Sequence, residues 1–225
     1  LEYYDGNQWV NITSTSPDVH TGGTRGLIMG GGYPNCTSTV RSIQVETTGN
    51  DATFGDLSAG TNRLINAGFS SRTRGIAAGG GSPTPNSPSN VIQQHAFAST
   101  GTFANFGTLS TARNEMSNLS DSTRGVMALG YPSTNDGIEY ITMASGGNAQ
   151  DFGDMTTATT GRGTMSSPTR GVMSSGELQA SPNAVTNTME YLNISTMGNM
   201  ADFGDAQRAV RYPAAIANAV RGVQA

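Results

Sequence analysis

Thr-Arg-Gly, at residues 24–26, returns at residues 73–75, 123–125 and 169–171, and a degenerate copy, Val-Arg-Gly, follows at residues 220–222. The five arginines are therefore 49, 50, 46 and 51 residues apart. Self-similarity at a period of about 50 residues is typical of repeat architectures, and kelch propeller blades have about this length. We expect one supersecondary unit that is copied several times.

A second marker, Phe-Gly, follows the same period and alternates with the first along the chain. It occurs as Phe54-Gly55-Asp56, Phe106-Gly107-Thr108, Phe152-Gly153-Asp154 and Phe203-Gly204-Asp205. Because the two markers alternate, the copied element is a whole unit and not one recurring tripeptide. We expect the phenylalanines to pack in the core between units.

The third unit shows the local pattern most clearly. Its residues 137–143 (Gly-Ile-Glu-Tyr-Ile-Thr-Met) alternate between two faces, and residues 145–148 (Ser-Gly-Gly-Asn) predict a turn, because Gly and Asn tolerate positive φ. Further short strands are expected at residues 150–155, 163–166 and 169–176. The other units match at the same offsets, so each offers four short strands, as a propeller blade requires.

The two ends of the chain complement each other. Residues 1–4 resemble the third strand of a unit, Asp5-Gly6-Asn7 predicts a hairpin turn, and residues 8–12 would be a fourth strand. A first strand near residues 212–217 and a second at 220–225 close the sequence. We therefore predict a single all-β domain, residues 1–225, folded as a five-bladed β-propeller with four-stranded antiparallel blades. Residues 1–12 would complete the blade formed with residues 206–225 and so close the ring.

Composition narrows the function classes. The 225 residues carry a net charge of −4, only 12% of them are charged, and every basic side chain apart from the two histidines is Arg. Nucleic-acid binding is not expected, because it usually needs a basic face. Cys36 is the single cysteine, so no internal disulfide can form, and no apolar run has membrane-spanning length. The first residue is Leu1 and not Met, which suggests a processed or excised piece.

The recurring residues are interpreted as structural, because a residue present in every unit usually does the same packing work in each. Arginine can satisfy several backbone carbonyls with its five donors. The structural set comprises Arg25, Arg74, Arg124, Arg170 and Arg221, with Phe54, Phe106, Phe152 and Phe203 and the acids Asp56, Asp154 and Asp205. We expect these acids to pair with the arginines, although Thr108 replaces the acid in the second copy.

The connection between the second and third strand of each unit varies in length and content. Strand alternation places all of these connections on one face, and repeat proteins commonly carry their binding residues on such a face. Tyr, Asn and Ser suit polar recognition and stacking on sugar rings. The candidate ligand-binding residues are Tyr33, Asn35, Asn86, Tyr131, Asn135, Asp136, Glu177 and Asn183. Surface loops without a binding role would show the same variation in length and content.

Neither catalysis nor a metal is expected. His20 and His95 are isolated, so no zinc site is predicted, no cofactor motif stands out, and calcium binding by Asp and Asn is left open. A glycosidase needs two converging carboxylates, and the spacing of the acids outside the repeat marks no such pair. Those acids are Asp18, Glu46, Glu115, Asp121, Asp136 and Glu177.

The repeat resembles the kelch-like repeats of tailed-bacteriophage virion proteins, including those of cyanobacterial phages. The resemblance is clearest at residues 138–155 and 169–176, and it covers essentially the whole chain. The opening Tyr-Asp-Gly-Asn-Gln-Trp at residues 4–9 is also similar to a short motif that precedes distal domains in phage fibres. The Gly-Gly, Tyr and Trp spacing of eukaryotic kelch blades is not reproduced, so no ubiquitin-ligase adaptor role is carried over.

The resemblance implies a non-enzymatic virion protein of a tail fibre or surface appendage that takes part in host attachment. Its expected partners are other virion proteins and, in an adhesive role, host surface polysaccharide, without nucleic acid or membrane insertion. Two alternatives stay open: a soluble bacterial lectin with one sugar pocket per blade, and a five-bladed glycoside hydrolase. Lectin pockets should repeat with the blades, whereas the connections here do not repeat.

Overall fold

The structure is a computed structural model, and it describes residues 2–4, 9–11, 24–31, 37–58, 67–83, 86–128, 130–132, 135–180 and 184–225. In this part of the chain all regular structure is β-strand, and every strand pairing is antiparallel. The prediction of an all-β chain is confirmed.

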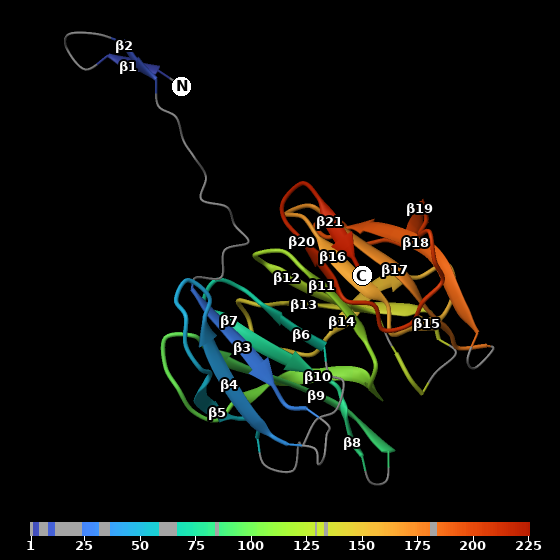
Figure 1. Cartoon of the computed structure of the whole chain (residues 1–225), viewed down its shortest axis with the longest axis horizontal. Coiled ribbons are helices and arrows are strands. Elements are labelled where there is room, and N and C mark those ends of the chain that lie inside the picture. The colour runs from blue at the N-terminus through green and yellow to red at the C-terminus, as the bar shows by residue number, and fades with distance from the viewer. Residues whose placement is uncertain are drawn as a thin grey trace.

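Four sheets follow one another in chain order, from the blue sheet I to the orange sheet IV (Figure 1). Sheet I contains β3 (Arg25–Met29), β4 (Thr39–Gln44) and β5 (Ala52–Asp56). Sheet II contains β6 (Ala67–Ser70), β7 (Arg74–Ala78), β9 (Asn86–Ala96) and β10 (Ala104–Arg113), with β8 (Gly81–Pro83) paired to β9. Sheet III contains β11 (Ser117–Ser120), β12 (Arg124–Ala128), β13 (Gly137–Thr142) and β14 (Gln150–Asp154). Sheet IV contains β15 (Thr159–Thr160), β16 (Gly163–Ser166), β17 (Arg170–Leu178), β18 (Val185–Asn193) and β19 (Ala201–Asp205).

Each end of the chain forms a two-stranded hairpin. The N-terminal hairpin joins β1 (Glu2–Tyr4) to β2 (Trp9–Asn11), and the C-terminal hairpin joins β20 (Ala215–Ala217) to β21 (Gly222–Gln224). Both pairs of strands lie where the sequence predicted them. The two hairpins are separate sheets, and the N-terminal one is drawn apart from the rest of the molecule (Figure 1). A single four-stranded sheet joining the two ends is therefore not formed among the described strands.

The first strands of successive units contact one another, so these units lie side by side. β6 contacts β11, β11 contacts β16, and β16 contacts β20. The hydrophobic core accordingly lies between sheets and not within one sheet. The contact between sheets II and III buries Phe106 and Ile141, and that between sheets III and IV buries Phe152 and Leu192.

The Phe-Gly marker is a β-bulge that receives the next sheet. The register slips at the phenylalanine in the pairs β4–β5, β9–β10, β13–β14 and β18–β19, so this residue is the extra one in each ladder. The glycine that follows leaves room for backbone: a Cβ at Gly55 would lie 1.8 Å from the carbonyl oxygen of Gly101, and one at Gly107 would lie 1.9 Å from that of Gly147. The backbone of the Phe-Gly marker therefore packs directly against the turn of the following sheet.

The arginine of Thr-Arg-Gly reaches in the same direction, from one sheet to the next. The Arg25 Nη1 donates to the carbonyl of Phe97 at 2.6 Å, and that of Arg124 donates to the carbonyls of Ile194 and Ser195 at 3.1 and 2.9 Å. Arg74 bonds Met143 and Ala144 in the same way. The expectation that the recurring arginine satisfies backbone carbonyls is confirmed for these three copies.

The expected pairing between these arginines and the acids of the second marker does not form. Arg124 pairs in register with Thr142 at one end of β13, whereas Asp154 pairs with Gly137 at the other end. The strand length separates the two charges. Among the described residues the ion pairs are Arg41–Asp51, Arg162–Glu190 and Arg211–Glu177, none of which uses Asp56, Asp154 or Asp205.

Candidate binding face

The ends of the second strands and the starts of the first strands lie together at one edge of the sheets. In sheet III, Ser117 at the start of β11 pairs with Ala128 at the end of β12. In sheet IV, Gly163 at the start of β16 pairs with Ser174, and β17 continues beyond it to Leu178. The variable connections and the links between sheets therefore emerge together, and we call this edge the variable-connection face. The recurring arginines lie at the opposite edge.

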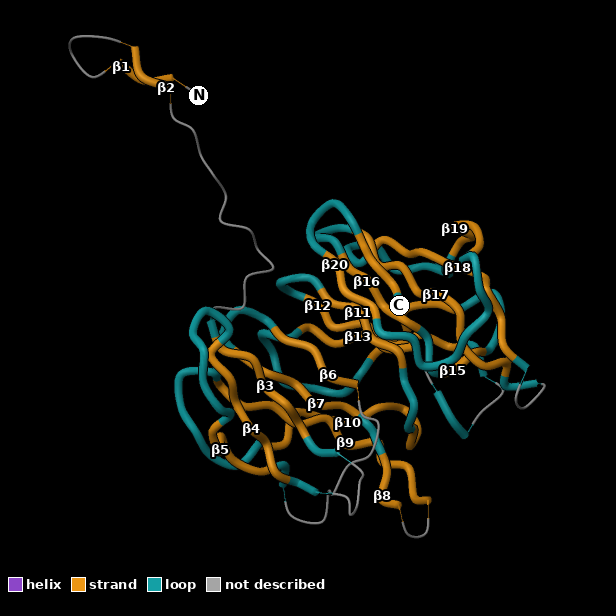
Figure 2. Tube along the Cα trace, in the orientation of Figure 1, coloured by secondary structure: helices purple, strands orange, loops and turns teal. Residues whose placement is uncertain are grey.

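The longest variable connection extends the sheet from which it emerges. Residues 81–83 form β8, which pairs with the beginning of β9, so the two strands project beyond sheet II (Figure 2). Asn86 begins β9, and the structure describes its backbone. Of the other predicted ligand-binding residues, Tyr33, Asn35 and Asn183 lie outside the described residues.

Three residues in the left-handed backbone region form a row on this face. Glu115 (φ 54°), Gly161 (φ 61°) and Tyr212 (φ 53°) each lie nine residues before a recurring arginine, at 124, 170 and 221. The amide N–H of Gly161 donates to the Glu115 carbonyl at 3.4 Å, and that of Tyr212 donates to the Gly161 carbonyl at 2.8 Å. Glycine adopts this backbone without strain, whereas Glu and Tyr do so at a cost of about 1–2 kcal/mol. Strained positions of this kind concentrate at functional sites.

The two strained side chains bond each other. The Tyr212 hydroxyl donates to Oε2 of Glu115 at 2.5 Å, and the Thr160 hydroxyl donates to the same oxygen at 3.4 Å. Burial raises the pKa of the Tyr212 phenol, and the hydrogen bond to Glu115 and the charges of Glu115 and Glu177 raise it further. The phenol therefore keeps its proton at neutral pH and acts as a donor. A raised pKa opposes use of this hydroxyl as a nucleophile.

A second carboxylate joins this group from the end of β17. Glu177 accepts a hydrogen bond from Arg211 at 2.9 Å, and its side chain is 16% exposed. Because Arg211 and Tyr212 are adjacent, Glu115 and Glu177 are held beside one dipeptide. We call Glu115, Glu177, Arg211 and Tyr212 the Glu-Tyr cluster. Glu115 and Glu177 both lie outside the repeat consensus, but their spacing in the sequence did not predict that they lie beside one dipeptide.

Tyr131 is joined to the residue before Glu115. The amide N–H of Asn114 donates to its carbonyl at 2.8 Å, and Arg113 donates to the carbonyl of Pro132 at 3.0 Å. The side chains of Tyr131 and Tyr212 are 44% and 48% exposed. The backbone of Tyr131 thus bonds Asn114, and the Tyr212 hydroxyl bonds the neighbouring Glu115 carboxylate.

Asn135 and Asp136 have local roles in the connection that leads to β13. The Asn135 side chain accepts a hydrogen bond from the Gly137 amide at 2.7 Å, and the Asp136 carbonyl accepts one from the Met155 amide at 2.8 Å. Asn135 and Asp136 therefore stabilise the connection that leads to β13. Only the sequence pattern grouped them with Tyr131 and Glu177.

The part of the chain that the structure describes contains neither a metal-binding cluster nor a membrane-spanning helix. Its His, Cys, Asp and Glu side chains form no group of three that could hold a metal ion. Nor does it contain a helix that is long and apolar enough to cross a membrane.

Comparison with known proteins found no family model that matches the chain and no matching curated protein.

Proposed function

We propose that this chain is a non-enzymatic phage virion protein of a tail fibre or surface appendage, and that its variable-connection face binds host surface glycan. The single observation that supports binding at this face is the pair of exposed tyrosines, of which Tyr131 bonds Asn114 through its backbone and Tyr212 bonds the Glu115 carboxylate through its hydroxyl. Sugar sites combine an aromatic surface for stacking with a few fixed polar groups. The virion assignment rests on the resemblance of the repeat.

The proposed architecture is a closed five-bladed β-propeller. Sheets I to IV are four of its blades, and the two terminal hairpins together supply the strands of the fifth. The side-by-side order of the first strands, β6, β11, β16 and β20, supports this arrangement. A lectin with one pocket per blade is less well supported, because the Glu-Tyr cluster has no counterpart at each of the described units.

Binding to host polysaccharide is tested with the purified chain on a glycan array and by titration of the best ligand. Tyr131→Ala is expected to weaken binding at least tenfold, because it removes one stacking surface. The matched control is Met197→Ala, since Met197 is 62% exposed in the β18–β19 turn at the opposite edge. Absence of binding to every polysaccharide, or equal effects of the two substitutions, would contradict the proposal.

A second candidate is a glycoside hydrolase, and the meeting of Glu115 and Glu177 at Arg211-Tyr212 favours it. Two carboxylates across a glycosidic bond are the usual catalytic pair. Depolymerisation of the bound polysaccharide that disappears in both Glu115→Gln and Glu177→Gln would establish this reading. Tight binding with an unchanged chain length of the polysaccharide supports the adhesive role.

A further inference from the structure

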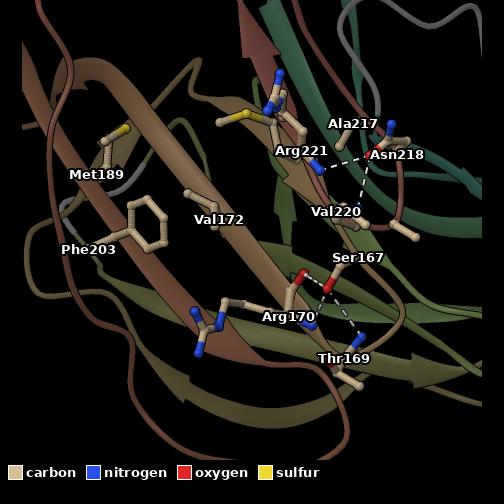
Figure 3. Close-up of a pocket in the computed structure, with 14 residues that line it drawn as sticks. Ser167, Thr169, Arg170, Val172, Met189, Phe203, Ala217, Asn218, Val220 and Arg221 are labelled. Atoms are coloured by element: carbon tan, nitrogen blue, oxygen red, sulfur yellow. Dashed lines mark hydrogen bonds between the residues drawn. The ribbon is translucent and has the colours of Figure 1, made fainter.

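A short turn precedes the recurring arginine in sheets II, III and IV and in the C-terminal hairpin. The first side chain of the turn accepts two amide N–H groups, that of the arginine and that of the residue before it. These acceptors are Ser71, Asp121, Ser167 and Asn218. Figure 3 shows the bonds of Ser167 and Asn218. Local hydrogen bonds therefore fix the turn, and the side chain of its second residue takes no part in them.

The second residue of this turn differs from copy to copy. Sheet II has Arg72 at this place, whereas the other copies have Gly23, Ser122, Pro168 and Ala219. A residue that one copy alone carries is not required by the packing that all copies share. The Arg72 side chain is exposed, and its guanidinium forms no hydrogen bond or ion pair with any residue that the structure describes. Arg72 is therefore a cation without a structural partner.

Arg72 lines a pocket of about 250 Å³ at the junction of sheets II and III. On one side lies the turn at residues 71–74 of sheet II, and on the other lie Ser122 and residues 143–144 of sheet III. Its walls carry two guanidinium groups, from Arg72 and Arg74, and the hydroxyl-bearing side chains of Ser71, Thr73 and Ser122. No acidic side chain is among the described residues that line it. The pocket therefore concentrates positive charge and hydrogen-bond donors.

The second guanidinium of the pocket is held in place by the protein. The Arg74 Nη1 donates to the side-chain oxygen of Gln94 at 3.0 Å and to the carbonyls of Met143 and Ala144, both at 3.3 Å. Its Nε and Nη2 donate to no acceptor within the described ranges. A guanidinium that is fixed through one nitrogen and keeps further N–H groups available suits the oxygens of an anion.

The corresponding place beside sheet IV has a different chemistry. A groove of about 550 Å³ lies between sheet IV and the turn of the C-terminal hairpin, and it includes the turn that precedes Arg170. Val172, Met189 and Phe203 give it apolar walls (Figure 3). The fifth blade proposed above would cover this groove. The pocket between sheets II and III differs because both of its neighbouring sheets are already present and its walls are polar.

We propose that the pocket between sheets II and III binds a tetrahedral oxyanion, either free phosphate or sulfate or the phosphate or sulfate ester of a saccharide. The guanidinium groups of Arg72 and Arg74 donate to its oxygens, and the hydroxyls of Thr73 and Ser122 are neutral donors. Because these donors come from two sheets, they suit oxygens that point in several directions better than a planar carboxylate. The pocket lies at the edge of the recurring arginines, so it is a second site apart from the variable-connection face.

One acid lies next to Ser122 in the sequence and opposes this binding. The Oδ1 of Asp121 accepts the amide N–H groups of Thr123 and Arg124 at 2.6 and 2.7 Å. Serine makes the same two bonds at residues 71 and 167. Asp121→Ser therefore keeps the hydrogen bonds of the turn while it removes a negative charge beside the pocket.

The anion site is tested by isothermal titration calorimetry of the whole chain with inorganic phosphate, inorganic sulfate and acetate. Ionic strength is held constant, because salt screens exposed charges. Dextran sulfate, with uncharged dextran as its control, tests the ester form. Arg72→Ser gives sheet II the residue type that sheet III has at Ser122. The matched control is Arg208→Ser, which removes an exposed arginine outside the pocket, and thermal unfolding of each variant verifies that it is folded.

Phosphate or sulfate is expected to bind the parent chain more tightly than acetate does. Arg72→Ser should weaken this binding about tenfold, because it removes charged hydrogen bonds, whereas Arg208→Ser should leave it within about twofold. Asp121→Ser should tighten it. Tyr131→Ala, the variant for the glycan site, should not change it, so failure of this site and failure of the glycan site are distinguishable.

The two sources of the anion give different results, and both agree with the proposal. Free ions bind without dextran sulfate if the pocket takes only the free anion, whereas dextran sulfate binding that is weakened in Arg72→Ser indicates an ester. Absence of binding of phosphate, sulfate and dextran sulfate would overturn the proposal. Equal losses in Arg72→Ser and Arg208→Ser would also overturn it, because the binding would then follow net charge and not the pocket.

Discussion

The junction between sheets III and IV and the free side of sheet IV are built from the same sequence marker in different surroundings. Phe152 is 2% exposed and its glycine supports the Gly198-Asn199 turn, whereas Phe203 is 48% exposed above an open groove. The difference teaches that the burial of the Phe-Gly marker depends on the sheet that follows it. The marker is the receiving half of a contact, and its contribution depends on the presence of the next turn.

The largest effect is expected inside the formed junction, at the ion pair of Arg162 and Glu190. Both side chains are almost fully buried, at 1% and 2% exposed, and Arg162 also donates to the carbonyls of Met173 and Thr188. Glu190→Ala leaves a buried guanidinium without its counter-charge, so we expect a loss of about 3–5 kcal/mol in the free energy of unfolding. Urea unfolding followed by circular dichroism measures it. A loss below about 1 kcal/mol would show that the pair is not buried in solution.

Substitution of Phe152 and of Phe203 tests the comparison between the formed junction and the free side of sheet IV. Phe152→Ala removes a buried ring and is expected to reduce the free energy of unfolding by about 3–5 kcal/mol. With the N-terminal hairpin in the groove, Phe203→Ala should cost a similar amount, within about 1 kcal/mol, because its ring is then buried too. With the groove empty, the second substitution should cost less than half of the first. Urea titration of both variants against the parent chain decides between the two states.

The arginines give a smaller effect. Arg124→Ala removes two hydrogen bonds to the carbonyls of Ile194 and Ser195 and a stacking contact with Tyr140 at 5.0 Å. We expect a loss of about 1–3 kcal/mol in the free energy of unfolding. Arg124→Lys should recover only part of it, since an ammonium group lacks the planar fork. Equal stabilities of the Lys variant and the parent would show that charge alone suffices.

Lowering the pH should destabilise the junction between sheets III and IV before it affects the free side of sheet IV. Burial by itself would raise the pKa of Glu190, but hydrogen bonds from Thr156 and Arg162 and the charge of Arg162 outweigh it, so the pKa is lowered from the ordinary value of 4.5. A lowered folded-state pKa contributes stability that is present above pH 4.5 and is lost as the pH falls through the folded value. Thermal unfolding between pH 7 and 3 should therefore show a steeper decline for the parent than for Glu190→Gln. Glu177→Gln serves as the control on the exposed face.

Sequence reasoning reached the repeated strands because the markers recur with the local patterns of turns and alternation. It assigned Arg25, Arg74 and Arg124 to backbone carbonyls correctly, since five donors in a unit with few acids have few other partners. It failed on the partner of Asp154, because the sequence does not say at which end of β13 each charge lies. It also missed the buried Arg162–Glu190 pair and the contact of Glu115 with Tyr212, which join residues 28 and 97 positions apart.

The sequence predicted which face carries the candidate binding residues, but not which of its residues come together there. Strand alternation placed Tyr131 and Glu177 at one edge, and the structure adds Tyr212 and Glu115, whose left-handed backbone has no mark in the sequence. Glu115 and Tyr212 occupy the position that Gly161 holds in the copy between them, so alignment of the units on their arginines is the one signal that could have found them.

Trp9 is the single tryptophan of the chain and provides the most direct test of ring closure. In the folded chain we predict the blue-shifted emission of an indole in apolar surroundings and slow quenching by acrylamide, both of which are lost in urea. Emission and quenching that already match the urea-unfolded chain under native conditions would mean that the hairpin stays in water. The groove beside Phe203 would then be open, and the five-bladed ring would be contradicted.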